Sequence, residues 1–222
     1  MTRRNRTTYT AALAAGALLL TSCGGGGDDT VDDEIAGAQT TAENTPEPEP
    51  SEDPTPTEPA DDDRPEIDLG PDFENVYEDD LTGDPVADAA LRDLRGFEDA
   101  VAEVIVTNDI GRPALRYYAS GEALDTALRV LDGIIEDGLS SAGTVRYFNR
   151  SVTILEGEEA ATFTQCRDSS GVDGINFVTG EILDERDPSS KPDLYAGRLE
   201  LNSEGVWQTV GFEQEPDSPL CA

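Results

Sequence analysis

The chain has 222 residues, of which 36% are hydrophobic and 6% aromatic, and its formal net charge is −33. Such an excess of acid argues against nucleic acid as a partner, because phosphate binding requires clustered Lys and Arg, and Lys191 is the single lysine. The sequence contains no histidine, which excludes His-based catalytic triads and the common zinc ligand sets. The acidic balance leaves divalent cations and cationic partners open, but no metal site and no cofactor are predicted.

Residues 1–22 have the three parts of an export signal. Three arginines lie within the first six residues, an apolar core occupies residues 11–20, and the small residues Thr21 and Ser22 follow. The apolar core is too short to span a bilayer, which takes about 20 residues. The segment is therefore predicted to direct export rather than to cross the membrane permanently.

The sequence Leu20-Thr21-Ser22-Cys23 resembles the lipobox of bacterial lipoproteins, in which an aliphatic residue and two small residues precede a cysteine. The resemblance implies that a diacylglycerol is attached to Cys23 and that cleavage makes this cysteine the first residue. Two acyl chains give stable anchoring where one gives only marginal binding. The expected location is the extracytoplasmic face of the cell membrane, with the lipid as the membrane contact. The alternative is an ordinary secretory signal with an incidental cysteine.

Residues 23–83 are predicted to form an acidic, Gly/Pro-rich disordered tether. Four glycines follow Cys23, and residues 24–85 contain 22 acidic residues against Arg64 alone. Proline and like-charge repulsion both extend such a chain. A calcium-responsive function for Asp61–Asp63 is the alternative, although these residues lack EF-hand spacing. The apolar patch Phe73–Tyr77 leaves open that this part docks on the folded domain or on a partner.

The folded domain is predicted to span residues 84–222 and to begin with helices. Asp84 is a suitable N-cap and Pro85 suits the first helical position. Apolar residues then recur at three- and four-residue steps as far as Ile105, which predicts one long amphipathic helix. A short helical piece follows Pro113, and a further helix is expected between Ser120 and Gly138.

From Gly143 the apolar period changes to the alternation typical of strands. A change of parity near Asn149-Arg150 predicts a β-bulge. Turns are expected at residues 156–158, 168–171 and 202–205. Helices followed by strands predict an α+β domain, with two to three helices packed on a curved antiparallel sheet of four to five strands.

This order of elements resembles the nuclear transport factor 2-like fold, and in particular small secreted and lipoprotein versions from actinobacteria. The shared landmarks are Gly205-Val206-Trp207, a cysteine on a long strand at Cys166, and the ending Pro219-Leu220-Cys221. The resemblance covers residues 84–222 and implies a cone-shaped fold. It does not imply one function, because the fold hosts isomerases, dehydratases and non-catalytic scaffolds.

Assigning Cys23 to a lipid leaves Cys166 and Cys221 as an even pair, which in an exported protein predicts a disulfide. The bond would join the C-terminal tail to a strand, and closing a loop of this size contributes about 4 kcal/mol in the chain-entropy estimate. The competing interpretation is a reactive thiol, but the sequence offers no histidine to activate it.

The pocket that the resemblance implies lies between the sheet and the helices. The aromatic candidates for its wall are Tyr117, Tyr118, Phe148, Phe163, Tyr195 and Trp207. The alternative for each of them is plain core packing. The hypothesis for the function is a non-catalytic module of the cell envelope that binds an unknown protein or small ligand.

The alternative function is an isomerase- or dehydratase-like enzyme that uses an Asp/Tyr pair in the pocket. Asp168 and Asp173 are the candidate bases, although both lie in predicted turns, which favours solvated surface carboxylates. No catalytic residue is assigned. Four arginines could surround an anionic ligand, although ion pairs with the surrounding acids are the favoured interpretation: Arg112, Arg116, Arg146 and Arg150.

Overall fold

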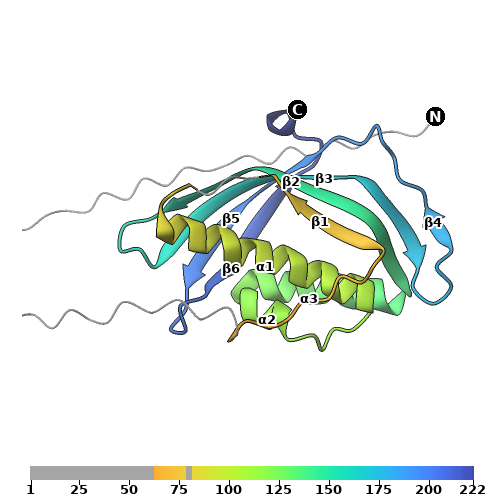
Figure 1. Ribbon diagram of the computed structural model, residues 1–222, viewed down its shortest axis with the longest axis horizontal. Helices are drawn as coiled ribbons and strands as arrows, with labels where there is room; N and C mark the ends of the chain where they lie inside the picture. The colour runs from red at the N-terminus through yellow and green to blue at the C-terminus, as the bar shows by residue number, and fades with distance from the viewer. Residues whose placement is uncertain (1–62, 79–81) are drawn as a thin grey trace, which may run out of the picture. The chain divides into compact units, whose positions relative to one another are not determined.

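The computed structural model describes residues 63–78 and 82–222, and in this part of the chain three helices cover one face of a curved sheet (Figure 1). The helices are α1 (Pro85–Thr107), α2 (Ala114–Tyr118) and α3 (Gly121–Glu136). The strands are β1 (Phe73–Tyr77), β2 (Leu139–Ile154), β3 (Ala160–Asn176), β4 (Ile182–Asp184), β5 (Asp193–Leu201) and β6 (Trp207–Glu215), followed by the 3-10 turn η2 (Pro219–Cys221). None of the helices in these two ranges is both long and apolar enough to cross a membrane.

Helix α1 is capped by polar residues at both ends, Asp84 at its start and Asn108 at its end. The Asp84 carboxylate accepts hydrogen bonds from the backbone N–H groups of Val86 (2.9 Å) and Ala87 (3.2 Å), which caps the helix as expected. Asn108 ends it in the left-handed conformation, and its side chain donates to the carbonyls of Ile105 and Leu139. The predicted long helix is therefore confirmed, and its C-terminal end is fastened to the start of β2.

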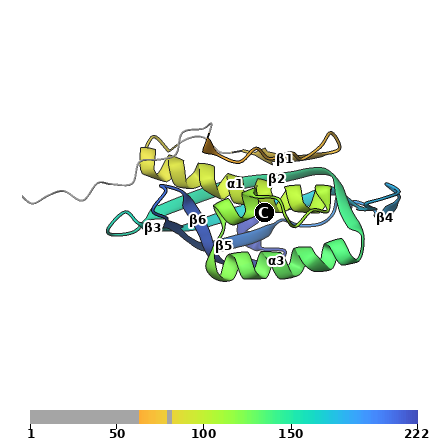
Figure 2. The ribbon, with the colours of Figure 1, turned by 90° about the horizontal axis from the view of Figure 1, so that it is seen from below.

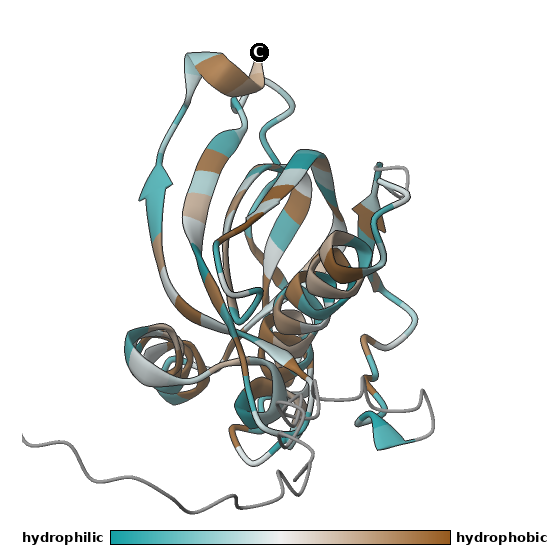
Figure 3. Cartoon of the chain, turned by 90° about the vertical axis from the view of Figure 1, so that its left-hand side faces the viewer, coloured by the Kyte–Doolittle hydropathy of each residue, from teal (hydrophilic) through white to brown (hydrophobic). Residues whose placement is uncertain are grey.

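The apolar stripe of α1 packs into the main core together with α2, α3 and the concave face of the sheet. Figure 3 shows the hydrophobic segments of α1 beside the curved strands, and Figure 2 shows α1 and α3 running side by side across the same face. Gly96 allows the closest approach, because a Cβ at this position would lie 2.5 Å from the ring of Tyr118. Residue 96 must therefore lack a side chain for α2 to pack on α1.

Within the described residues, the sheet has six strands: five in the order β1-β2-β3-β5-β6, and β4 paired to the end of β3. Strands β2, β3, β5 and β6 form the expected antiparallel series, and the expected bulge is present between Phe148 and Ser151. The α+β architecture is therefore confirmed. Two details differ from the prediction: β1 pairs with β2 in parallel, and the described sheet has six strands rather than four to five.

The segment 63–78, here called the N-terminal strap, corrects the boundary that we placed at Asp84. Its strand β1 is part of the sheet, and Figure 2 shows β1 on the other side of α1 from α3. Three acids of α1 hold the strap: Asp93 binds Arg64, Glu103 accepts from the backbone N–H of Asp68, and Asp99 accepts from Asn75 and Tyr77. The apolar patch in β1 therefore docks on the domain, as the alternative interpretation allowed.

Strand β3 corrects a second expectation. The strand continues through residues 168–171, where a shift of register opposite Thr144–Arg146 takes the place of the expected turn, and its 17 residues pair with most of the 16-residue β2. Cys166 lies in this strand and forms the expected disulfide with Cys221 of η2, with 5.6 Å between the two Cα atoms. The bond fixes the C-terminal turn against the sheet. The predicted export signal and Cys23 lie outside the described residues.

Candidate functional site

A cavity of about 410 Å³ lies between α1, α3 and the concave face of the sheet. Most of its lining is apolar and comes from every layer of the fold. These residues are Phe73, Phe97, Val101, Ala102, Ile105, Ala127, Val130, Leu131, Ile134, Val145, Val172 and Phe212. Several of them remain partly exposed, and Val130 is 54% exposed, so the cavity opens to solvent beside α3. This volume falls within the range of small-molecule pockets, roughly 300–1,000 Å³.

A carboxylate lies in the wall of this cavity. Glu98 follows Leu94 by four residues and precedes Val101 by three, which places it on the apolar face of α1. It is 9% exposed, accepts a hydrogen bond from the hydroxyl of Tyr147 (3.0 Å), and accepts another from the side-chain amide of Gln165. Burial raises the pKa of Glu98, and the nearby charge of Arg167 only partly offsets this.

Arg167 supplies the positive charge of this cluster. Arg167 lies opposite Tyr147 in the antiparallel ladder of β2 and β3, and its guanidinium lies 3.5 Å from the hydroxyl of Tyr195. Burial alone would lower the pKa of Arg167, but Tyr147, Tyr195 and Glu98 raise it, so the group stays protonated. Burial also raises the pKa of Tyr147 well above its ordinary value and raises that of Tyr195. Both phenols therefore remain neutral at physiological pH and can donate hydrogen bonds.

The strap completes the cavity wall. Phe73 and Asn75 both line the cavity from β1, and Asn75 is only 8% exposed. Its amide nitrogen donates to Asp99 (2.9 Å), whereas its Oδ1 accepts no hydrogen bond within the described part of the chain. A segment that we expected to be tether thus contributes both an apolar and a polar group to the site.

Of the six aromatic candidates, the structure brings only Tyr195 to the cavity wall. Tyr118, Phe163 and Trp207 are at most 5% exposed and belong to the main core, and Tyr117 packs against that core. Phe148 is partly buried on β2, where its ring lies 5.8 Å from the guanidinium carbon of Arg146. Four of the six aromatic candidates therefore pack in or against the core, which was the alternative interpretation.

The two candidate aspartates do not line the cavity. Asp168 lies 3.4 Å from Arg146, and Asp173 is bound by Arg186, whose hydrogen bonds lower the pKa of that carboxyl. Nor do the four arginines ring one site. Arg112 pairs with Glu103, Arg116 donates to the carbonyl of Ile110, Arg146 pairs with Glu78 and Asp168, and Arg150 donates to the carbonyl of Leu91.

Sequence reasoning missed Glu98, Tyr147, Gln165 and Arg167. A signal for Glu98 was present, because an acid occurs at a position where the helical period of α1 demands an apolar residue. The other three face the same side only because of the register between β2 and β3, which the β-bulge shifts. The pairing register of β2 and β3 cannot be predicted from the hydrophobic pattern of the sequence alone.

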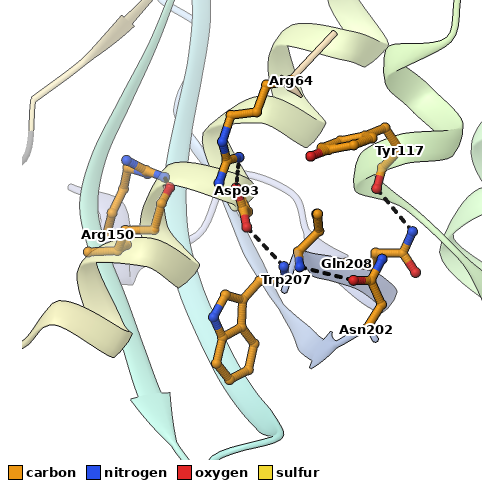
Figure 4. Close-up of polar contacts among 9 residues, drawn as sticks. Arg64, Asp93, Tyr117, Arg150, Asn202, Trp207 and Gln208 are labelled. Carbon is orange, nitrogen blue, oxygen red and sulfur yellow. Dashed lines mark hydrogen bonds and ion pairs between the residues drawn. The ribbon is translucent and has the colours of Figure 1, made fainter. Parts of the chain in front are cut away.

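A second buried carboxylate lies on α1 but does not line the cavity. Asp93 is fully buried, accepts a hydrogen bond from the backbone N–H of Trp207 (2.9 Å), and binds Arg64 of the strap (Figure 4). Burial raises its pKa, and the bonds from Trp207 and Arg64 oppose that rise. Because Asp93 is fully buried and is not among the residues that line the cavity, this cluster belongs to the closed core.

Comparison with known proteins gives no match to a protein-family model and none among curated proteins. Among solved structures, the chain is similar to the intermembrane space region of the chloroplast protein ARC6, with 13% identity, 59% of this chain and 96% of that one covered, and a TM-score of 0.40. It is also similar to a ketosteroid isomerase-like protein from Erwinia carotovora atroseptica, with 18% identity, coverage of 58% and 97%, and a TM-score of 0.34.

Proposed function

We propose that this chain is a lipid-anchored lipoprotein of the cell envelope whose α+β domain is a non-catalytic module that binds a small, largely apolar ligand. The observation that supports ligand binding is the cavity of about 410 Å³, which has an apolar lining and a few buried polar groups. Ligand pockets have this composition, because apolar walls supply affinity and a few polar groups fix orientation. A protein partner is the alternative for such a module, but a cavity inside the fold favours a small molecule.

The proposed anchor rests on the sequence alone. The basic start, the apolar core and Leu20-Thr21-Ser22-Cys23 together favour a lipid on Cys23. Replacing Cys23 by Ala should release the protein from membranes or leave it unprocessed, as measured by membrane fractionation and lipid labelling. Unchanged fractionation with unchanged labelling would contradict the anchor.

Ligand binding is tested with the full chain carrying Cys23→Ser, which removes the proposed acylation site and so avoids detergent. The probe is 1-aminoanthracene, an uncharged fluorophore whose emission rises in apolar surroundings. We expect saturable binding, and we expect Val101→Trp to weaken it strongly, because the indole ring would occupy part of the cavity. The matched control is Val178→Trp, which places the same side chain on the β3–β4 hairpin at a residue that is 85% exposed.

Unchanged affinity in a folded Val101→Trp protein would show that the probe binds elsewhere. Circular dichroism and thermal unfolding of both tryptophan variants establish that they fold. No saturable binding by the parent protein would contradict the ligand-binding proposal directly.

A second candidate function is acid–base catalysis, and one observation favours it. Glu98 has a raised pKa and shares a hydrogen bond with Tyr147 in the cavity wall, as a carboxylate and a tyrosine do in isomerases that act beside a carbonyl. Against it, both carboxylate oxygens already accept hydrogen bonds. Deuterium exchange next to the carbonyl of 2-cyclohexenone tests it: exchange above background that Glu98→Gln abolishes would support the enzyme.

A further inference from the structure

The orientation of the Asn75 amide is fixed by the helix beside it. Asp99 accepts hydrogen bonds on one carboxylate oxygen from both the Asn75 amide nitrogen (2.9 Å) and the hydroxyl of Tyr77 (2.8 Å). A carboxylate accepts and does not donate, so the nitrogen of Asn75 must face Asp99 and the oxygen must face away from it.

The Oδ1 atom of Asn75 is therefore a buried acceptor on a residue that lines the cavity. Asn75 is 8% exposed, and the described residues supply no donor to this atom. Its parallel-strand partner is Val145, which is apolar and also lines the cavity. A buried acceptor without a donor is unfavourable, and a ligand that supplies a donor removes that cost.

The charges around Asn75 determine which chemical group of a ligand can approach its Oδ1 atom. A carboxylate ligand would direct an oxygen at another oxygen, with Asp99 immediately behind it and Glu98 in the same cavity. An ammonium ligand would share the cavity with the protonated Arg167, and its charge would lose its hydration among aliphatic side chains. A neutral hydroxyl meets neither penalty.

We infer that the ligand of this cavity is an uncharged amphiphile whose hydroxyl donates to Asn75 Oδ1 while its apolar body fills the space between α1, α3 and the sheet. This inference rests on the proposed function and names the ligand class for that site. It also assigns ligand selection to the strap, because Asn75 belongs to β1 and not to the helices or to the antiparallel strands.

The test compares three probes in the full-length Cys23→Ser protein by displacement of 1-aminoanthracene: 1-decanol, decyl methyl ether and decanoate. The ether keeps the apolar body and the oxygen of the alcohol but has no donor. We expect decanol to bind about tenfold more tightly than the ether, since one hydrogen bond to a buried acceptor contributes about 1–1.5 kcal/mol. Decanoate should bind more weakly than decanol.

The deciding variant is Asn75→Leu, which should bring the two affinities to within about twofold while the affinity for the ether is retained. Retained binding of the ether shows that the cavity is intact, and Asn75→Val, which suits a strand, serves if the leucine variant does not fold. The matched control is Glu74→Leu on the exposed face of β1, which should leave the preference for decanol unchanged.

Equal affinity for decanol and its ether in the parent protein would overturn the inference, as would a preference that persists in Asn75→Leu. Tightest binding by decanoate would overturn it as well and would point to Arg167 as the determinant. In each of these outcomes the cavity still binds a ligand, so the proposed function stands. Failure of the 1-aminoanthracene signal itself would instead contradict the proposed function.

Discussion

Asp93 and Glu98 lie five residues apart on α1, and burial raises the pKa of both. Their surroundings differ. Asp93 faces the closed core, where the backbone N–H of Trp207 and the guanidinium of Arg64 bind it. Glu98 lies in the wall of the cavity, where a tyrosine hydroxyl and a glutamine amide donate to it and Arg167 lies nearby.

This difference separates a structural carboxylate from one that is available to a ligand. The partners of Asp93 come from opposite ends of the described chain, so this residue connects the strap, α1 and β6. The partners of Glu98 are neutral groups of neighbouring strands beside a space that a small molecule fits. Burial and a raised pKa alone therefore do not identify a functional acid; what lies opposite the carboxylate does.

The comparison predicts the largest loss of stability at Asp93. Asp93→Ala leaves the Arg64 charge and the Trp207 N–H without their acceptor in the core, so we expect a loss of about 3–5 kcal/mol in the free energy of unfolding. Urea denaturation measures this loss. Asp93→Asn keeps an acceptor for the N–H group and should lose less; a loss below about 1 kcal/mol in Asp93→Ala would contradict the structural role.

A second prediction concerns the strap end of the same cluster. Arg64→Met removes the cation from Asp93 and should destabilise by about 2–3 kcal/mol, less than Asp93→Ala because the N–H of Trp207 keeps its acceptor. Combining Arg64→Met with Asp93→Asn should cost clearly less than the sum of the single changes, because the two groups act as a pair. Additive losses would show that the strap and the core are not coupled here.

The pH dependence of stability sharpens the comparison at Glu98. The folded protein holds a proton at Glu98 more tightly than the unfolded chain, so its contribution to stability is complete below the ordinary pKa of 4.5 and is lost as the pH rises through the raised value. Glu98→Gln removes this loss. Relative to the parent, the variant should therefore gain stability as the pH is raised from about 4 to 7, measured by urea denaturation at each pH.

A relative stability of Glu98→Gln that does not change with pH would show that Glu98 titrates normally. Tyr147 can still serve the new side chain, because its hydroxyl both donates and accepts. The stability difference at any one pH should accordingly stay smaller than that of Asp93→Ala.

The smallest effect is expected at Tyr195, where the cavity cluster meets solvent. Tyr195→Phe removes a hydroxyl 3.5 Å from Arg167 and should change the free energy of unfolding by less than about 1 kcal/mol. The affinity for 1-aminoanthracene should change by no more than about threefold, since this probe is apolar. A loss of stability equal to that of Asp93→Ala would remove the distinction between the two clusters.

Local sequence signals predicted most of the fold. The Asp84-Pro85 start, the helical period of α1 and the parity change near Asn149 are short-range patterns, and the structure shows each of them. The parallel pairing of β1 was not predicted, because its five residues follow an acidic, proline-rich stretch and their partner lies about 70 residues away. Local composition favoured a tether, whereas the strap is held in the fold by the pairing of β1 with β2 and by contacts with three acids of α1.

The candidate site was predicted less well for a related reason. Aromatic residues were chosen as pocket candidates, but large rings also fill cores best, and Phe163 and Trp207 do so. The polar groups that mark the cavity meet across strands and are set by register. Glu98 was the one group that could have been found from the sequence, through its place on an apolar helical face.

The contacts of the strap also fix how the domain would bear a mechanical load. Tension applied at the N-terminal side of the described domain reaches the ion pair between Arg64 and Asp93 first and the bond from Asp68 to Glu103 next. The tension reaches β1 last, and β1 is held by its hydrogen-bonded pairing with β2. Because Phe73 and Asn75 belong to that last element, the ion pair at Arg64 shields the cavity from forces transmitted along the chain.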